Sequence, residues 1–218
     1  MEERWKRSEE TRAKLIDAAG QVFSRRGFRA TTVREICSLA GAPLGAVNYH
    51  FRGKQGLYEA VFEYSMESAI EKYPPQLGIA DGATPEDKLR AFVRSFLLRV
   101  LDQGVPAWHM KLIAQEISDP AGASDDLLES VIQPVYRYLV CILTEILKKD
   151  DAGDDRESDL VFLSAMSIVG QCLYHFTGRR VIEALCPKNF NAEIEQIADH
   201  ITQFSLYGIR RISKKKRK

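Results

Sequence analysis

Apolar residues recur every three or four positions along most of the chain, a spacing that predicts helices and leaves no convincing strand pattern. Leu89, Phe92 and Phe96, for example, fall on one face of a single predicted helix. Helices are expected at roughly residues 8–26, 32–39, 44–50, 54–73, 84–102, 107–118, 124–149, 157–185 and 191–213. The pattern therefore predicts an all-α protein.

Helix breakers and capping residues set most of these boundaries. Pro74-Pro75 and the glycine-bearing loop 76–83 end the long helix 54–73, because proline lacks the amide hydrogen that a helix needs. Thr84 then offers an N-cap, which is followed by a first-turn proline and two acids. Gly104 and Pro106 are expected to end a helix, and Asn191 is expected to cap the start of the last one. Within helices, a kink is expected at Pro134 and a bend near Gly178.

The segment 32–58 places two short helices around a glycine. Thr32 and Glu35 have the spacing of a capping box, and Gly41 stands where a residue tolerating positive φ ends a helix. In the second helix, Val47 and Phe51 are expected to point inward. The outward face would then carry Leu44, Gly45, Ala46, Asn48, Tyr49 and His50. This layout is typical of a DNA-binding helix-turn-helix, although any short amphipathic helix pair shows a similar pattern.

The sequence around this segment decides between those two interpretations. It contains AA-x-x-x-F from Ala18, a G-F step followed by T-T from Gly27, I-x-x-x-A-G from Ile36 and Y-H-F-x-x-K-x-x-L from Tyr49. On these motifs, residues 11–58 resemble the DNA-binding head of the TetR/AcrR family of transcriptional regulators. AVNYHF, together with GQCLYHF at 170–176, is further similar to the CecR-like subgroup over a shorter stretch.

The resemblance implies roles for individual residues. Phosphate contacts are implied for Thr32, Tyr49, His50 and Lys54, and base-edge contacts for Arg34, Leu44, Gly45, Ala46 and Asn48. Two departures stand out. The turn, commonly V-S-K in the family, is Ala42-Pro43-Leu44 here, which removes a serine cap and a lysine contact. Gly56 replaces an acidic or larger residue, and we expect this change to affect only local helix stability.

The expected architecture is a three-helix helix-turn-helix head, a long connector helix and a C-terminal antiparallel helical bundle. The head would span residues 1–54, the connector and bundle 55–213, and a basic tail 214–218. A chain of 218 residues is long enough to bury a substantial core in this arrangement. The tail follows a helix end, where lysines and arginines are usually solvated, so we expect no specific role for it.

Charge is segregated along the chain although the net charge is only +1. Residues 1–54 have a basic surplus of five, the tail adds five more positive charges, and the middle has an acidic surplus of nine. Seven cations of the head are expected to supply its basic surface: Arg4, Lys6, Arg7, Arg12, Arg25, Arg26 and Arg29. Each alone would be an ordinary solvated side chain, but as a cluster they favour salt-dependent binding to DNA.

Composition excludes several other classes. The N-terminus lacks the apolar core of a secretion signal, and no run approaches the roughly 20 apolar residues of a membrane span, so a cytoplasmic protein is expected. The cysteines Cys37, Cys141, Cys172 and Cys186 are far apart in the sequence and form no C-x-x-C motif. His109, His175 and His200 have no metal-ligand spacing with them, so neither a metal nor another cofactor is expected. Without a nucleophile elbow, phosphate loop or dinucleotide motif, an enzyme is not expected.

Two helix faces suggest a homodimer. The last predicted helix has a narrow apolar seam, and its predecessor has small residues that permit close helix contact. The expected interface residues are Ser164, Ala165, Ser167, Ile194, Ile197, Ile201, Phe204 and Gly208. The alternative is that these faces pack only within one copy. A dimer would set two heads about 34 Å apart, one turn of duplex DNA, and so fit a palindromic operator.

Aromatic and polar residues in the middle helices suggest an effector pocket. The candidates are Trp108, His109, Leu112, Glu116, Gln171, Tyr174 and His175, although each is also a plausible core residue. The family resemblance implies a small-molecule effector that releases DNA. The sequence thus predicts a dimeric repressor released by a ligand. The alternative is a DNA-anchored factor whose helical body binds another protein and has no small-molecule switch.

Overall fold

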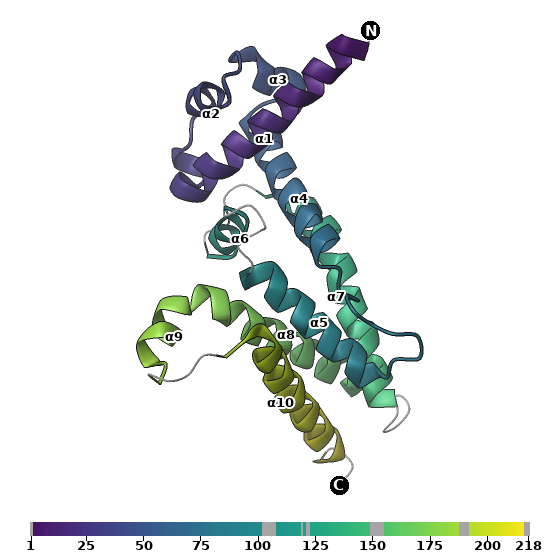
Figure 1. The fold of residues 1–218 in the computed structure, drawn as a ribbon. Helices are drawn as coiled ribbons and strands as arrows, with labels where there is room; N and C mark the ends of the chain where they lie inside the picture. The colour runs from purple at the N-terminus through teal and green to yellow at the C-terminus, as the bar shows by residue number, and fades with distance from the viewer. Residues whose placement is uncertain are drawn as a thin grey trace. The chain divides into compact units, whose positions relative to one another are not determined.

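A computed structural model describes residues 2–101, 108–118, 120, 123–148, 155–187 and 192–215. Throughout these ranges the regular structure is helical and no strand occurs, which confirms the all-α fold class. The helices are α1 Glu2–Ala30, α2 Val33–Ala40, α3 Gly45–Phe51, α4 Lys54–Lys72, α5 Pro85–Leu101, α6 His109–Ser118, α7 Asp125–Lys148, α8 Asp155–Thr177, α9 Arg179–Leu185 and α10 Ile194–Lys215 (Figure 1).

The helices form two compact units, each assembled from two separate stretches of chain. Unit 1 comprises residues 1–68 and 103–131, and unit 2 comprises residues 69–102 and 132–218. The boundary expected at residue 54 therefore falls inside unit 1. The reason is that Leu57, Tyr58 and Phe62 of α4 are buried in the same core as the helix-turn-helix.

The core of unit 1 joins α6 to the N-terminal helices. Phe23 and Tyr58 meet edge to face with ring centroids 4.9 Å apart. Trp108, just before α6, lies so close to Gly20 of α1 that a Cβ at position 20 would overlap the indole. Leu112 follows on the same side of α6 and is fully buried. α6 thus joins α1, α2, α3 and α4 in the hydrophobic core behind the helix-turn-helix.

Buried hydrogen bonds also fix α4 against α6 in unit 1. The Tyr58 hydroxyl donates to the Glu116 carboxylate at 2.7 Å, and the backbone amide of Ala123 donates to the same carboxylate at 3.0 Å. Ser65 and His109 form a second buried hydrogen bond between the two helices. A buried polar group is costly unless it is paired, so these contacts specify one register of α6 along α4.

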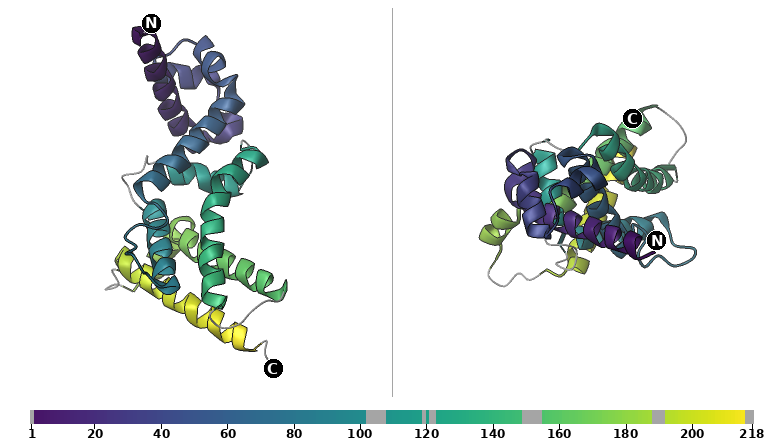
Figure 2. Two further views of the ribbon diagram at one scale, coloured as in Figure 1. Left: turned by 90° about the vertical axis from the view of Figure 1, so that its right-hand side faces the viewer. Right: turned by 90° about the horizontal axis from the view of Figure 1, so that it is seen from above.

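The core of unit 2 lies among α5, α7, α8 and α10. Leu89, Phe92 and Leu97 of α5 are fully buried, in agreement with the apolar face predicted for this helix. α10 packs along α5, as the teal and yellow helices of Figure 2 show. The remaining core residues of the unit include Leu139, Ile142, Leu143, Ala165, Ile168, Cys172, Ala198 and Ile201.

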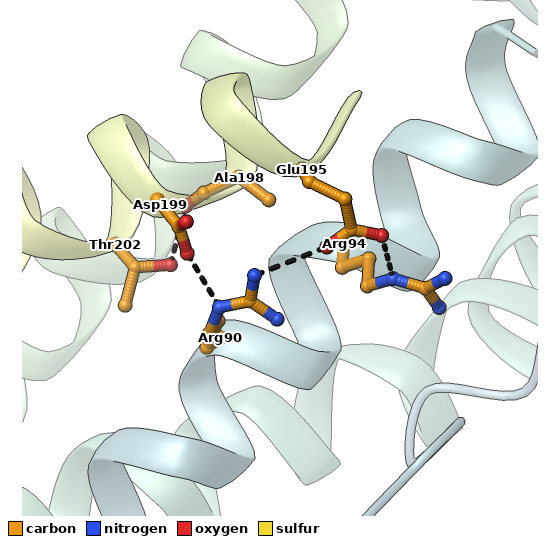
Figure 3. A network of polar contacts seen from close by, with 6 residues as sticks. All are labelled: Arg90, Arg94, Glu195, Ala198, Asp199 and Thr202. Carbon is orange, nitrogen blue, oxygen red and sulfur yellow. Dashed lines mark hydrogen bonds and ion pairs between the residues drawn. The ribbon is translucent and has the colours of Figure 1, made fainter. Parts of the chain in front are cut away.

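An ion-pair network secures the α5–α10 contact at its surface. Arg90 reaches both Asp199 and Glu195, with Nη2 3.0 Å from the Glu195 carboxylate (Figure 3). Arg94 holds the other oxygen of Glu195. Beneath this layer, the Thr202 hydroxyl donates to the carbonyl of Ala198 at 2.7 Å within α10. The network fixes the start of α10 against the middle of α5.

Most helix boundaries follow the sequence pattern, with a few differences. α1 begins at Glu2, six residues earlier than expected, and Gly27 interrupts its last turns with φ 75°. Gly178 separates α8 from α9, where a bend was expected. Pro134 lies inside α7. The expected breaks at Gly104 and Pro106 and the cap at Asn191 lie outside the described residues.

Within the described part of the chain, two helices are long and apolar enough to cross a membrane, if length and composition alone are considered. They are Asp125–Leu147 of α7 and Asp159–Thr177 of α8. The sequence pattern had predicted no such segment. Core helices of soluble proteins pass the same test, and both helices contribute to the core of unit 2.

Candidate nucleic-acid interface

The first helix of the turn begins at a threonine cap. Thr32 has an extended backbone, and its hydroxyl accepts a hydrogen bond from the amide of Glu35 at 3.3 Å. This is one half of the predicted capping box. The Glu35 carboxylate accepts a hydrogen bond from Arg26 of α1 at 2.8 Å. The acidic residue thus ties α2 to α1, while the threonine fixes where α2 starts.

The turn is made by Gly41 and the three residues after it. Gly41 has φ 62°, as predicted for a helix-ending glycine, and Ala42 donates its amide to the carbonyl of Cys37 at 2.9 Å. Leu44 is already helical, and α3 has no side-chain cap at its start. The missing cap follows from the Ala42-Pro43-Leu44 sequence. The amide of Ala46 instead donates to the carbonyl of Pro43 at 2.9 Å.

The second helix of the turn, α3, has one buried and one exposed face. Val47 and Phe51 are buried, as predicted. Asn48 is exposed and Tyr49 is 78% exposed, an unusual exposure for a tyrosine. The other predicted contact residues are also on the surface: Leu44 and Gly45 are exposed, and Ala46 and His50 are half-buried. α3 thus presents the mixed small and polar face that suits a DNA groove.

Thr32, the N-cap of α2, and Arg34 of α2 are both exposed. Lys54 has a structural role besides the predicted phosphate contact. Its ammonium group donates to the carbonyl of Arg29 at 3.3 Å and lies 4.5 Å from the Phe28 ring centroid. Burial lowers the pKa of Lys54 from its ordinary value. Lys54 therefore ties the end of α1 to the start of α4, besides bringing a cation to this surface.

Gly56 has more influence than the sequence suggested. A Cβ at this position would overlap the carbonyl oxygen of Phe51, the last residue of α3. The end of α3 and the first turn of α4 are therefore close enough that only glycine fits. The expectation that this departure affects only local helix stability needs correction, because the residue sets the approach of α3 to α4.

The early start of α1 places basic N-terminal residues of the head beside α3. Trp5 is 69% exposed, and with Arg7 it lines an open hollow of about 670 Å³. Tyr49 and His50 of α3 also line this hollow. The sequence analysis counted Arg7 among the cations of the head, but its predicted helix start at residue 8 did not place Trp5 on this helix.

The predicted effector residues near α6 belong to the core of unit 1. Trp108, His109, Leu112 and Glu116 are all buried. Glu116 is held by Tyr58 and Ala123, and His109 by Ser65. Their pattern of aromatic and polar residues reflects the packing of α6 against α1 and α4.

The remaining effector candidates belong to α8 in unit 2, so the structure does not place all the predicted residues in one unit. Gln171 is half-buried and its amide nitrogen lies 3.4 Å from the Ser205 hydroxyl of α10. Tyr174 is exposed and packs on Gly178. His175 is half-buried, and burial lowers its pKa from the ordinary value.

The predicted dimer residues divide between two sides of α8 and α10. Ser164, Ala165 and Ile201 are buried within the protomer, and Ile194 and Ile197 pack partly against the same core. Ser167, Phe204 and Gly208 are exposed. The exposed apolar neighbours are Phe162, Leu163, Met166, Tyr174 and Tyr207. The face available to a second copy is therefore this exposed one, since both helices have apolar residues on two sides.

Two short helices joined by a glycine turn, the second with one exposed face, are the features of a helix-turn-helix DNA-binding protein. Comparison with known protein families agrees with this class. Residues 15–61 match the family model of bacterial regulatory proteins, tetR family. Residues 85–209 match that of the HTH-type transcriptional dual regulator CecR, C-terminal domain. The chain belongs to the TetR family of transcriptional regulators, and its body is of the CecR type.

Characterised relatives are regulators of the same kind. The chain is 28% identical over 185 residues to the HTH-type transcriptional dual regulator CecR of Shigella flexneri, covering 81% of this chain and 80% of that protein. It is 34% identical over 157 residues to the HTH-type transcriptional repressor KstR2 of Mycolicibacterium smegmatis, covering 69% and 72%. Both are named as transcriptional regulators rather than enzymes.

Solved structures share the fold at low identity. AibR in complex with isovaleryl coenzyme A and operator DNA superposes with a TM-score of 0.63 at 19% identity, covering 89% of this chain and 97% of that one. FadR from Bacillus subtilis in complex with stearoyl-CoA has a TM-score of 0.64 at 18% identity, covering 90% and 98%. These likenesses show the TetR-type fold.

Proposed function

We propose that the protein is a cytoplasmic, dimeric repressor that binds a palindromic operator and leaves it when a small molecule binds. The observation that carries this proposal is the exposed face of α3, fixed from behind by the buried Val47 and Phe51. The repressor named among its relatives supports the direction of control. The family membership supports the DNA target.

The proposed contacts follow the exposure of each side chain. Asn48 and Arg34 are exposed and would reach base edges, with Leu44, Gly45 and Ala46 close to the groove floor. Thr32, Tyr49, His50 and Lys54 would hold the phosphates on either side.

Dimerisation is supported by the exposed apolar side chains of α8 and α10. Leu163 and Met166 are on α8, Phe204 and Tyr207 are on α10, and Gln171 contacts Ser205 between the two helices. An apolar surface of this kind is more favourable when another surface covers it. A four-helix contact between two copies would cover it and place two α3 helices on one duplex.

Effector release is supported by the fold neighbours and by one shared helix. AibR and FadR are crystallised with coenzyme A thioesters, and a ligand in the corresponding body of this chain would lie in unit 2. α4 begins in unit 1 and its last residues belong to unit 2. If α4 has two positions, a ligand that binds one of them more tightly would shift the protein toward that position and so change its affinity for the operator. The size of the change is set by the ratio of the ligand's affinities for the two positions.

Two alanine variants separate the base and phosphate roles. Asn48→Ala should weaken binding to an operator selected from random duplexes by about 1 to 3 kcal/mol and flatten base preference. Lys54→Ala should weaken operator and scrambled duplex alike and reduce the salt slope by about one. Fluorescence anisotropy over a salt series measures both effects.

The exposed Lys111 on α6 provides the matched control, since Lys111→Ala removes the same charge from the same unit away from α3. Its binding should equal that of the wild type. Lys54→Ala also loses the contacts to Arg29 and Phe28, so its fold is checked by circular dichroism. Indistinguishable behaviour of Asn48→Ala and Lys54→Ala would contradict the assignment.

A further inference from the structure

Unit 2 contains a buried cation whose hydrogen-bonding capacity is not filled. Arg99 of α5 is 6% exposed. Its Nη1 donates to the carbonyl of Tyr73 at 2.9 Å. Its Nη2 is buried as well, and no residue that the structure describes accepts a hydrogen bond from it. One side of the guanidinium fork is therefore unpaired inside the protein.

Among the described residues, the side chains placed against the Arg99 guanidinium include an aromatic ring and a thiol but no carboxylate. The guanidinium carbon lies 5.3 Å from the centroid of the Phe96 ring. The thiol of Cys172 on α8 interacts electrostatically with Arg99, and burial raises the pKa of this thiol to about 12, so it is neutral. Burial lowers the pKa of Arg99 only to about 10, which leaves the side chain protonated at neutral pH.

Other arginines of the same helix show the usual arrangement. Arg90 and Arg94 are partly exposed and are paired with Glu195 and Asp199. A buried charge is expected to be paired as well, because removing it from water costs several kcal/mol unless a partner compensates. Arg99 is the more deeply buried of the three and has no carboxylate partner among the described residues.

The hydrogen bond from Arg99 to the Tyr73 carbonyl does not explain why an arginine stands at this position. The Tyr73 carbonyl also accepts from the Ser95 hydroxyl at 2.7 Å, so this oxygen keeps a partner without Arg99. A methionine would fill similar volume beside Phe96 with no desolvated charge. If residue 99 only filled space in the core, a neutral side chain would stabilise the fold more than a buried charge.

We infer that Arg99 binds the anionic group of the effector, and that the effector is a small carboxylic acid or phosphate ester with an apolar body. A guanidinium offers two parallel N–H donors that match a carboxylate or a phosphate, and Nη2 is the donor left over for it. Phe96 and Cys172 provide apolar neighbours for the rest of the molecule. This inference rests on the proposed effector response and names the chemistry of the ligand.

The test compares three eight-carbon probes on the full-length protein: octanoate, octyl phosphate and the neutral octanol. At least one anion should raise Tm in a thermal-shift assay and bind in calorimetry, and octanol should do neither. The two anions distinguish a carboxylate from a phosphate ligand. In Arg99→Met, Kd for the effective anion should rise about 10- to 100-fold, as expected for a lost charge-assisted hydrogen bond.

Stability without ligand separates a binding role from a structural one. Arg99→Met should have a Tm equal to or above that of the wild type, because an unpaired buried charge is removed. Arg94→Met, which loses the pair with Glu195, should have a slightly lower Tm and an unchanged response to the anion. Either a lower Tm for Arg99→Met than for Arg94→Met, or an unchanged anion affinity in Arg99→Met, would overturn the inference.

Failure of this inference is distinguishable from failure of the proposed function. If neither anion binds, or octanol binds as well as the anions, the inference fails while operator binding by the dimer is unaffected. If an anion binds through Arg99 but operator affinity does not change, the anion site stands and the effector-controlled repressor is contradicted.

Discussion

At the scale of single residues, Gly56 gives the sharpest prediction about the DNA-binding unit. Replacing it by alanine should lower the free energy of unfolding of unit 1 by about 1 to 3 kcal/mol, as overpacking typically does. The new methyl group would displace the carbonyl of Phe51 and with it the end of α3. Urea unfolding measures the stability, and operator affinity should fall with it.

Gly45 provides the control for Gly56. It lies at the start of α3, and nothing within 4 Å would meet a Cβ there. Gly45→Ala should therefore leave stability unchanged or raise it slightly, since alanine favours a helix. A Gly56→Ala variant as stable as Gly45→Ala would show that the α3–α4 junction is not tight.

Individual residues were predictable where the chain itself fixes their environment. Thr32, Gly41, Val47 and Phe51 have local signals, a cap, a turn and a helical repeat, and the structure places them as expected. Arg99 was missed although it follows Phe96 by three positions on an apolar helix face. Its unpaired state depends on what α4 and α8 bring near it, which a single helix pattern does not contain.

At the scale of elements, the α5–α10 network predicts a pH-dependent contribution. Hydrogen bonds from Arg94 and then Arg90 lower the pKa of Glu195. Its stabilising effect is therefore complete above the unfolded pKa of about 4.3 and is lost as pH falls through the lower folded value. Glu195→Gln should lower the unfolding free energy at pH 7 by about 0.5 to 1 kcal/mol, a modest value because the pairs are partly exposed.

Urea unfolding at pH 7 and below pH 4 measures this effect. The difference between Glu195→Gln and wild type should shrink at the lower pH and in high salt. Glu193→Gln alters an exposed carboxylate two residues earlier and should have little effect at either pH. If Glu195→Gln lowered the free energy of unfolding by the same amount at both pH values, the ion-pair explanation would be contradicted.

Helix positions followed from the sequence because caps and breakers are local signals. The packing partners of each helix could not be predicted in the same way. α6 was assigned to an effector pocket because Trp108 and Glu116 combine aromatic and polar character, but both are buried in unit 1, Trp108 against Gly20 and Glu116 in a hydrogen bond with Tyr58. The small residues of α8 likewise predicted close packing without showing which side faces the protomer's own core.

At the scale of the whole molecule, the exposed face of α8 and α10 predicts a dimer. Tyr207 is 72% exposed on α10, and Tyr207→Glu would place a charge in the proposed interface. Loss of a central aromatic contact costs about 2 kcal/mol or more, so the dimer Kd should rise at least about 30-fold. Sedimentation velocity measures the shift toward monomer, and operator affinity should decrease with it.

Leu185 on α9 provides the matched control, since it is also a large exposed apolar residue of unit 2. Leu185→Glu should remain dimeric and bind the operator normally. A wild-type protein that sediments as a monomer at micromolar concentration, or a Leu185→Glu variant that dissociates in place of Tyr207→Glu, would contradict the proposed interface.

The division of each unit between two stretches of chain has a consequence during synthesis. The core that supports α3 includes Trp108 and Leu112, which are translated long after the helix-turn-helix itself. A nascent chain released or cleaved near residue 54 would thus expose Leu15, Phe23 and Val22 to chaperones and proteases. The ribosome must add about half of the protein before its DNA-binding end can fold to completion.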